Sequence, residues 1–258
     1  MSKSTVVIGR PGSGKTAYLM DRVTEALEEG IPPSRIGMVS FTRAAVMVAA
    51  KRAAELMKHT GGGTDAKDFV NFKTLHAMAF SLLSLRKSRV MAGKHTEDFQ
   101  ALTGYNLSGI DVGEGTVANT IGSGSLYYHN LARARIETVA RVMQEYPSRD
   151  VCPAQVREFG KAYTKFKASR GLMDFSDILE VAITENVTAP DLSVLLVDEA
   201  QDLSSLQWRF LDILSARADR VYYVGDSNQA IYSWAGADPD RFKLGPARQQ
   251  SLIKGHRM

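Results

Sequence analysis

The fold is decided by one short stretch, Gly9-Arg10-Pro11-Gly12-Ser13-Gly14-Lys15-Thr16. It matches the pattern G-x-x-x-x-G-K-[ST] at every fixed position. An apolar, strand-like run precedes it at 5–9, and residues 15–29 place Ala, Leu and Val at helical spacing after it. A strand, this loop and a helix in that order form the context that a phosphate-binding loop requires, which disfavours an accidental match in a glycine-rich turn.

The residue types of this loop suit a nucleotide. Glycines allow backbone N–H groups to surround phosphate oxygens at a helix N-terminus. Lys15 supplies positive charge to the β- and γ-phosphates, and the hydroxyl of Thr16 is a ligand for Mg²⁺. We therefore expect residues 9–16 to bind ATP together with Mg²⁺.

A second candidate site lies at the end of the apolar run 194–197, where Asp198 and Glu199 follow directly. The carboxyl ends of parallel strands form the ligand-binding edge of a sheet. There Asp198 is placed to hold Mg²⁺ through water, and Glu199 to orient and deprotonate the water that attacks the γ-phosphate. The alternative is that these acids merely cap the following helix.

Apolar strands and helices alternate in two separate parts of the chain, which predicts an α/β fold with a parallel sheet covered by helices on both faces. The expected strands are 5–9, 36–40, 68–71, 194–197 and 221–225, and the expected helices are 15–29, 43–60 and 205–216. Between the two parts, residues 86–171 break the alternation and are predicted to be a helical insertion. The core would then comprise 1–85 and 172–258.

The insertion has a Gly/Ser-rich stretch at 108–125 and helical segments at 127–144 and 155–167. It carries thirteen Lys and Arg against eight Asp and Glu from 86 to 170. This surplus permits a polyanionic partner, but a solvated helical face explains it equally well.

Composition excludes several classes of protein. With 44% hydrophobic and 23% charged residues, the chain of 258 residues resembles an ordinary soluble protein, and no apolar run reaches the ~20 residues of a membrane span. The N-terminus has no secretory signal pattern. Cys152 is the only cysteine, so no internal disulfide or thiolate metal cluster can form. We expect a cytoplasmic protein without membrane partners.

One further stretch narrows the field of nucleotide-binding proteins: Val224-Gly225-Asp226-Ser227-Asn228-Gln229-Ala230-Ile231-Tyr232-Ser233-Trp234-Ala235-Gly236-Ala237. It resembles the GDxxQxIYxxxGA signature of the UvrD/Rep family, the superfamily 1A DNA helicases. The sequences SFTRAA at 40–45, TLHAM at 74–78 and DFSDIL at 174–179 are similar to that family's TFTNKAA, TxHSF and DFDDLL elements. The resemblance covers 6–85 and 173–238.

This resemblance implies the first RecA-like domain of such a helicase, with single-stranded DNA as partner. It implies that Gln229 senses the γ-phosphate and that Thr42 binds DNA. It also implies that Phe41, Tyr232 and Trp234 lie near the nucleotide or DNA bases, with Trp234 the best candidate for stacking on a base. Base stacking holds a strand by about 1–3 kcal/mol per base without reading its sequence. For the aromatics, filling the core is the alternative, and for His76 a DNA-backbone contact and a structural role stay open.

Some positions depart from the family pattern. No glutamine precedes Gly9 to read adenine, and Ala17 and Ala235 stand where the family often has arginine. Residues 252–258 resemble the start of the family's next motif, so Arg257 would reach the γ-phosphate unless it is a surface residue. In this family a second RecA-like domain adds a transition-state arginine, and without that domain or a partner protein we expect weak or no hydrolysis by this chain.

Two functions follow. The first is the ATP-binding motor domain of a helicase or translocase that moves 3′ to 5′ on single-stranded DNA, the direction being implied by the resemblance. The second is a stand-alone, nucleotide-dependent module that binds DNA or protein without unwinding. A small-molecule kinase is disfavoured because it leaves the signature from Gln229 to Trp234 unexplained.

Overall fold

The computed structural model describes residues 3–59, 65–108, 120–226, 236–244 and 248–252. Its centre is a sheet of six strands in the order β3-β2-β4-β5-β1-β6, and every pairing between these strands is parallel. The strands are β1 (Lys3–Gly9), β2 (Ile36–Val39), β3 (Asn71–Lys73), β4 (Leu192–Val197), β5 (Ala218–Gly225) and β6 (Arg248–Leu252). The predicted α/β fold with a parallel sheet is confirmed.

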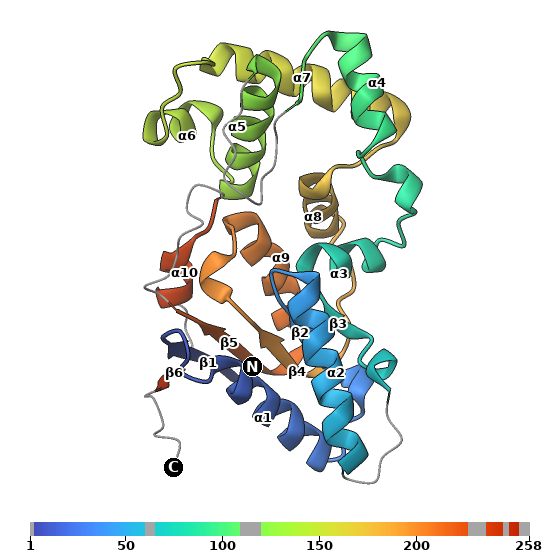
Figure 1. The fold of residues 1–258 in the computed structure, drawn as a ribbon, viewed down its shortest axis with the longest axis vertical. Coiled ribbons are helices and arrows are strands. Elements are labelled where there is room, and N and C mark those ends of the chain that lie inside the picture. Colours follow the sequence, from blue (N-terminus) through green and yellow to red (C-terminus); the bar gives the residue numbers. More distant parts are fainter. Residues whose placement is uncertain (1–2, 60–64, 109–119, 227–235, 245–247, 253–258) are drawn as a thin grey trace.

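Helices cover both faces of this sheet (Figure 1). Residues of α1 and α2, such as Leu19 and Val46, pack against one face, and residues of α3, α8 and α9, such as Phe210, pack against the other. All six residues of β4 are buried, as a strand covered on both faces requires. The helices are α1 (Lys15–Glu28), α2 (Arg43–His59), α3 (Leu75–Leu82), α8 (Phe175–Thr184), α9 (Ser205–Ser215) and α10 (Pro239–Leu244).

The remaining helices gather away from the sheet, at the top of Figure 1, and have apolar clusters of their own. In one cluster Phe99 packs edge to face against both Phe159 and Tyr163, and Leu131 and Val156 belong to another cluster. These helices are α4 (Lys94–Thr103), α5 (Ile121–Arg135), α6 (Val139–Glu145) and α7 (Pro153–Arg170). They lie within the predicted insertion 86–171, whose boundaries stay a prediction.

The segments that enter and leave this helical part lie side by side. Val90 and Met173 form an isolated parallel bridge, in which Met91 donates its N–H to the carbonyl of Met173 and Met173 donates to that of Arg89, both at 2.8 Å. The guanidinium of Arg89 also donates to the carbonyl of Gly171 at 3.0 Å. The two ends of the helical part are therefore held next to each other.

Two sequence predictions were wrong in detail. The third strand is Asn71–Lys73 rather than 68–71, because Asp65 and Asp68 form a capping box that turns Ala66–Asp68 into a 3-10 helix. The segment 127–144 is two helices, because Ile136 adopts a left-handed conformation (φ 58°) and Thr138 caps a new helix. The Gly/Ser-rich stretch ends inside α5, whose residues 122–125 are buried.

The described residues also form short 3-10 helices at Pro33–Arg35, Ala66–Asp68, Lys87–Arg89 and Ala200–Asp202. No helix within the described part of the chain has the length and hydropathy that a membrane span needs.

Candidate functional site

The glycine-rich loop connects the end of β1, which lies between β5 and β6 in the sheet, to the start of α1. Its turn is closed by the N–H of Ser13, which donates to the carbonyl of Arg10 at 3.0 Å. Gly12 (φ 72°) and Gly14 (φ 91°) adopt left-handed conformations that side chains rarely allow. A Cβ on Gly9 would lie 2.3 Å from Ser13 Oγ. The loop conformation therefore depends on glycine at these positions.

Lys15 lies between the loop and the acidic end of β4. Its Nζ donates to the carbonyl of Gly9 at 3.3 Å and lies 3.8 Å from Glu199 Oε2, and its side chain is only 12% exposed. Ser13 Oγ is buried and has no hydrogen-bond partner among the described residues. A poorly exposed ammonium group and an unpaired hydroxyl at a helix N-terminus fit an anion such as a phosphate group.

The two acids at the end of β4 differ in their surroundings. The N–H of Asp198 donates to the carbonyl of Val39 at 2.9 Å, and Asp198 Oδ2 is 3.5 Å from the hydroxyl of Ser40. Burial and the neighbouring charge of Glu199 raise the pKa of Asp198 to about 6. Glu199 adopts a left-handed conformation (φ 49°), uncommon for a residue with a side chain, which points to a functional constraint. A cation would relieve the cost of ionising Asp198 here.

Gln201, which the sequence analysis left without a role, joins the acids to the next strand. Its side chain is buried, donates to Glu199 Oε2 at 3.0 Å and to Asp202 Oδ2 at 3.1 Å, and accepts from the N–H of Asp226 at 3.0 Å. Burial and the charge of Glu199 raise the pKa of Asp202 to about 6. An amide with both hydrogen-bonding groups engaged fixes the positions of its partners.

A cavity of about 330 Å³ lies on the other side of Ser40 and Asp202. The core contributes Phe41, which is 47% exposed, and His76, whose ring meets that of Phe175 edge to face at 5.5 Å. Burial lowers the pKa of His76 to about 4 despite the charge of Asp174. Helix α5 forms the opposite wall with Leu126, Tyr127, Asn130, Leu131 and Ala134.

The structure thus brings part of the predicted site together. Lys15, Asp198 and Glu199 meet at one edge of the sheet, and Phe41 and His76 line one cavity. Thr42 is exposed and accepts from the N–H of Ala45 at 3.1 Å, which begins α2. Thr16 is also exposed, on the first turn of α1, beside loop residues Arg10 and Pro11 that are exposed as well.

Four predicted residues lie outside the described part of the chain: Gln229, Tyr232, Trp234 and Arg257. Sequence reasoning assigned no role to Ser40, Gln201 or Asp202, although each stands within two or three residues of a predicted site residue. Their proximity in the sequence to Asp198 and Phe41 could have indicated a role. The hydrogen bonds of Ser40 and Gln201 with Asp198 and Asp226, however, depend on packing between distant segments.

The sequence of this chain is similar to those of several DNA helicases. The chain is 30% identical over 273 residues to the ATP-dependent DNA helicase UvrD2 of Mycobacterium bovis, covering 94% of this chain and 37% of that protein. It is 20% identical to the ATP-dependent DNA helicase Rep of Buchnera aphidicola over 264 residues, 94% of this chain and 36% of that protein. DNA helicase II of Escherichia coli is 23% identical over 270 residues, 92% and 33% respectively.

The chain therefore spans about a third of the length of these relatives. The family model for the UvrD/REP helicase N-terminal domain matches residues 1–246, which include the glycine-rich loop, the acids after β4 and the cavity. This chain belongs to the UvrD/REP helicase N-terminal domain family.

Proposed function

We propose that this chain is an ATP-hydrolysing motor domain that moves 3′ to 5′ on single-stranded DNA as part of a helicase. One observation carries the proposal: the acids beside the phosphate loop and the cavity with exposed Phe41 share a wall. Gln201 hydrogen-bonds Glu199 on the nucleotide side and Asp202 on the cavity side. A change at the γ-phosphate that moves Glu199 can therefore alter, through Gln201 and Asp202, the cavity that would receive DNA.

In this proposal Lys15 and the loop N–H groups bind the phosphates of ATP, and Glu199 orients and deprotonates the attacking water. Gln229 senses the γ-phosphate, and Arg257 contacts it. The ion pair between Lys15 and Glu199 keeps both side chains directed at the same space until a nucleotide enters. Glu199 is then held by Gln201, which leaves its carboxylate oriented for the water.

Thr16 and Asp198 are the residues that would hold Mg²⁺. The described residues contain no group of three or more His, Cys, Asp or Glu side chains arranged around a metal site. This fits Mg²⁺ in a nucleotide site, which takes one or two protein oxygen ligands and completes its shell with phosphates and water. When bound, the ion neutralises charge that develops on the phosphate oxygens.

Single-stranded DNA would lie over the cavity, with its bases against Phe41, Tyr232 and Trp234 and its backbone near Thr42 and His76. The neutral form of His76 suits a hydrogen bond to a phosphate or sugar oxygen rather than an ion pair. Stacking supplies grip without sequence reading, which a translocating motor requires.

Turnover at a helicase rate would need an arginine from a second motor domain or a partner protein, because such an arginine contributes about 10³–10⁵ in rate to related reactions. The relatives are about three times longer than this chain, which leaves room for that domain.

The test is steady-state ATP turnover of the chain and of Glu199→Gln, each with and without single-stranded DNA, beside nucleotide affinity. Glu185→Gln, at the exposed end of α8, is the matched control. We expect DNA to stimulate turnover, Glu199→Gln to lower it by about 10²–10⁴ while still binding ATP, and the control to match the parent chain. DNA-independent turnover, or equal turnover in Glu199→Gln, would contradict the motor. Binding without turnover would favour a nucleotide-dependent binding module.

Direction is tested on strands with a bulky block at one end, using the chain joined to a second motor domain. Displacement of a block at the 5′ end supports 3′ to 5′ movement, and displacement at the 3′ end contradicts it.

A further inference from the structure

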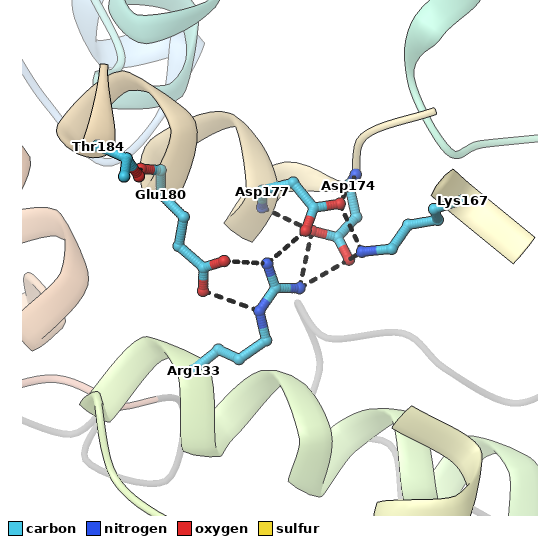
Figure 2. A network of polar contacts seen from close by, with 6 residues as sticks. All are labelled: Arg133, Lys167, Asp174, Asp177, Glu180 and Thr184. Atoms are coloured by element: carbon cyan, nitrogen blue, oxygen red, sulfur yellow. Dashed lines mark hydrogen bonds and ion pairs between the residues drawn. The ribbon is translucent and has the colours of Figure 1, made fainter. Parts of the chain in front are cut away.

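Five charged side chains meet where α5 and α7 approach the start of α8 (Figure 2). Arg133 of α5 donates from Nη1 to Asp174 Oδ2 at 2.9 Å, from Nη2 to Asp177, and from Nε to Glu180 Oε1 at 2.9 Å. Lys167 of α7 donates to both Asp174 and Asp177. Two cations from the helical part thus hold three acids on one helix beside the sheet.

This ion cluster is poorly accessible to water. The side chain of Lys167 is 4% exposed, that of Asp174 is 11% and that of Arg133 is 15%. Burial opposes the ionisation of Asp174, but the charges of Arg133 and Lys167 hold its pKa below the usual value. Asp174 and Asp177 also cap α8, each accepting the other's N–H at 2.8 Å. Charges this fully paired have one favourable arrangement, so the cluster fixes the angle and position of α5.

Arg133 is surrounded in the sequence by the residues that α5 contributes to the cavity. Asn130, Leu131 and Ala134 line it, opposite Phe41 and His76 of the core. The cavity therefore exists only while α5 stays against the core. The paired segments around Val90 and Met173 hold the two ends of the helical part, but α5 begins about thirty residues beyond Val90 and its placement needs another anchor.

Helix α5 also touches Gly236, near the end of the signature that contains Gln229. Gly236 has φ 96°, and a Cβ built on it would lie 3.0 Å from that of Ala134 and 3.5 Å from Leu131. Asp238, two residues on, donates its N–H to the carbonyl of Leu203 at 2.8 Å, next to Asp202. A shift of α5 would therefore change both the shape of the cavity and the packing against Gly236 at the end of the signature.

We propose that Arg133 is a positioning residue: by clamping α5 to the start of α8 it sets the cavity wall and thereby the strength with which single-stranded DNA is held. The DNA part of this inference rests on the proposed function. Arg133 lies away from the phosphate loop, so its loss affects nucleotide binding little.

The first measurement reports the position of α5 without DNA. Cys152 is the only cysteine and is exposed, so Cys152→Ser removes the background and Ala134→Cys places one thiol in the cavity wall. The rate of thiol labelling is compared in the presence of Arg133→Gln, Arg133→Lys and Arg135→Gln. Arg135 is the matched control, since it lies on the same helix but pairs with Glu137 and Glu145 inside the helical part.

We expect Arg133→Gln to raise the labelling rate about fivefold or more, and Arg133→Lys to give an intermediate rate because lysine keeps the charge but not the fork of donors. Arg135→Gln should label at the parent rate. An unchanged rate in Arg133→Gln overturns the clamp, whether or not the chain binds DNA.

The second measurement is the affinity for single-stranded DNA and for a nucleotide, without the labelling substitutions. Arg133→Gln should weaken DNA binding about fivefold or more and change nucleotide affinity less than about twofold. Faster labelling with unaltered DNA affinity would overturn the link from α5 to DNA. A parent chain that binds no DNA would contradict the proposed function and leave the labelling result to decide the clamp.

If Arg133→Gln loses nucleotide binding as well, the domain has unfolded. Glu180→Gln then replaces it, because Glu180 is the most exposed acid of the cluster, at 40%. Faster labelling with intact nucleotide binding supports the clamp, and the parent rate overturns it.

Discussion

The side chain of Gln201 accepts a hydrogen bond from the backbone N–H of Asp226 at 3.0 Å, across 25 residues of sequence. Both residues are 2% exposed. Through its amide nitrogen, Gln201 also holds Glu199 and Asp202. The ends of β4 and β5 are thereby linked by one amide, at the third residue of the signature stretch that begins at Val224.

Replacing Gln201 by methionine, of similar size, should lower the free energy of unfolding by about 1–3 kcal/mol, since the buried hydrogen bond from the N–H of Asp226 to the amide oxygen of Gln201 would be lost. It should also lower ATP turnover, because Glu199 loses its orientation. Urea denaturation and turnover measure the two effects. Gln100→Met is the matched control, because Gln100 Oε1 accepts a hydrogen bond from the N–H of Leu107 at 2.7 Å. This variant should be less stable than the parent but should keep its turnover per folded molecule. Parent stability in Gln201→Met would contradict this account.

The phosphate loop makes a prediction about two residues together. A methyl group on Gly9 would lie 2.3 Å from Ser13 Oγ and 3.0 Å from Lys15 Cγ, so Gly9→Ala should weaken nucleotide binding about tenfold, or about 1.4 kcal/mol. Ser13→Ala removes the clashing oxygen, and that oxygen is buried without a partner among the described residues. The double variant should therefore bind more tightly than Gly9→Ala in a fluorescent-nucleotide titration. Equal weakening in both would show that the oxygen is not the obstacle.

Acid should destabilise the fold through two histidines. Burial lowers the pKa values of His76 and His129 to about 4, below the value of about 6.5 in an unfolded chain. Between these pH values the unfolded state binds more protons than the folded state. The free energy of unfolding is therefore unaffected by the two histidines above pH 6.5 and falls as the pH is lowered towards 4. Each pKa unit corresponds to about 1.4 kcal/mol.

The measurement is the free energy of unfolding from pH 7 to 4 for the parent chain, His76→Gln and His129→Gln. Each variant should lose stability less steeply than the parent. Asp198 and Asp202, whose pKa values are raised to about 6, contribute with the opposite sign over this range, so only the difference between parent and variant isolates each histidine. Identical slopes would exclude both histidines as the cause.

Gly236 tests the contact between α5 and the core. Gly236→Ala should lower the free energy of unfolding by about 1–3 kcal/mol through its positive φ, and further through the 3.0 Å approach to Ala134. Gly30→Ala, at φ 80° after α1, is the control: a Cβ there has no described atom within 4 Å, so the substitution adds backbone strain without a contact. Thermal and urea unfolding should show that Gly236→Ala is less stable than Gly30→Ala. Adding Ala134→Gly to Gly236→Ala should remove the contribution of the close contact. Equal losses of stability at the two glycines would mean that α5 moves away from the added methyl group without lowering the free energy of unfolding.

The sequence predicted most of the sheet because β1, β2, β4 and β5 contain apolar runs and one loop has fixed glycine and lysine positions. It did not predict β6, because the sequence of Arg248–Leu252 is mostly polar. It placed β3 at 68–71 instead of Asn71–Lys73, because the capping box of Asp65 and Asp68 forms a 3-10 helix at the start of the expected strand. It predicted that Lys15 and Glu199 belong to one site, since both follow parallel strands. It did not predict the pairing of Arg133 with Asp174, because a basic residue on a helix indicates exposure unless its distant partners are known.

The parallel bridge between Val90 and Met173 also bears on how such a chain changes in evolution. Because the two strands of the junction run side by side, a few residues would suffice to close the core without the segment between them. An insertion with adjacent ends can be lengthened, exchanged or removed without altering the register of the sheet. The ion cluster around Arg133 would then be the part that each new insertion has to rebuild.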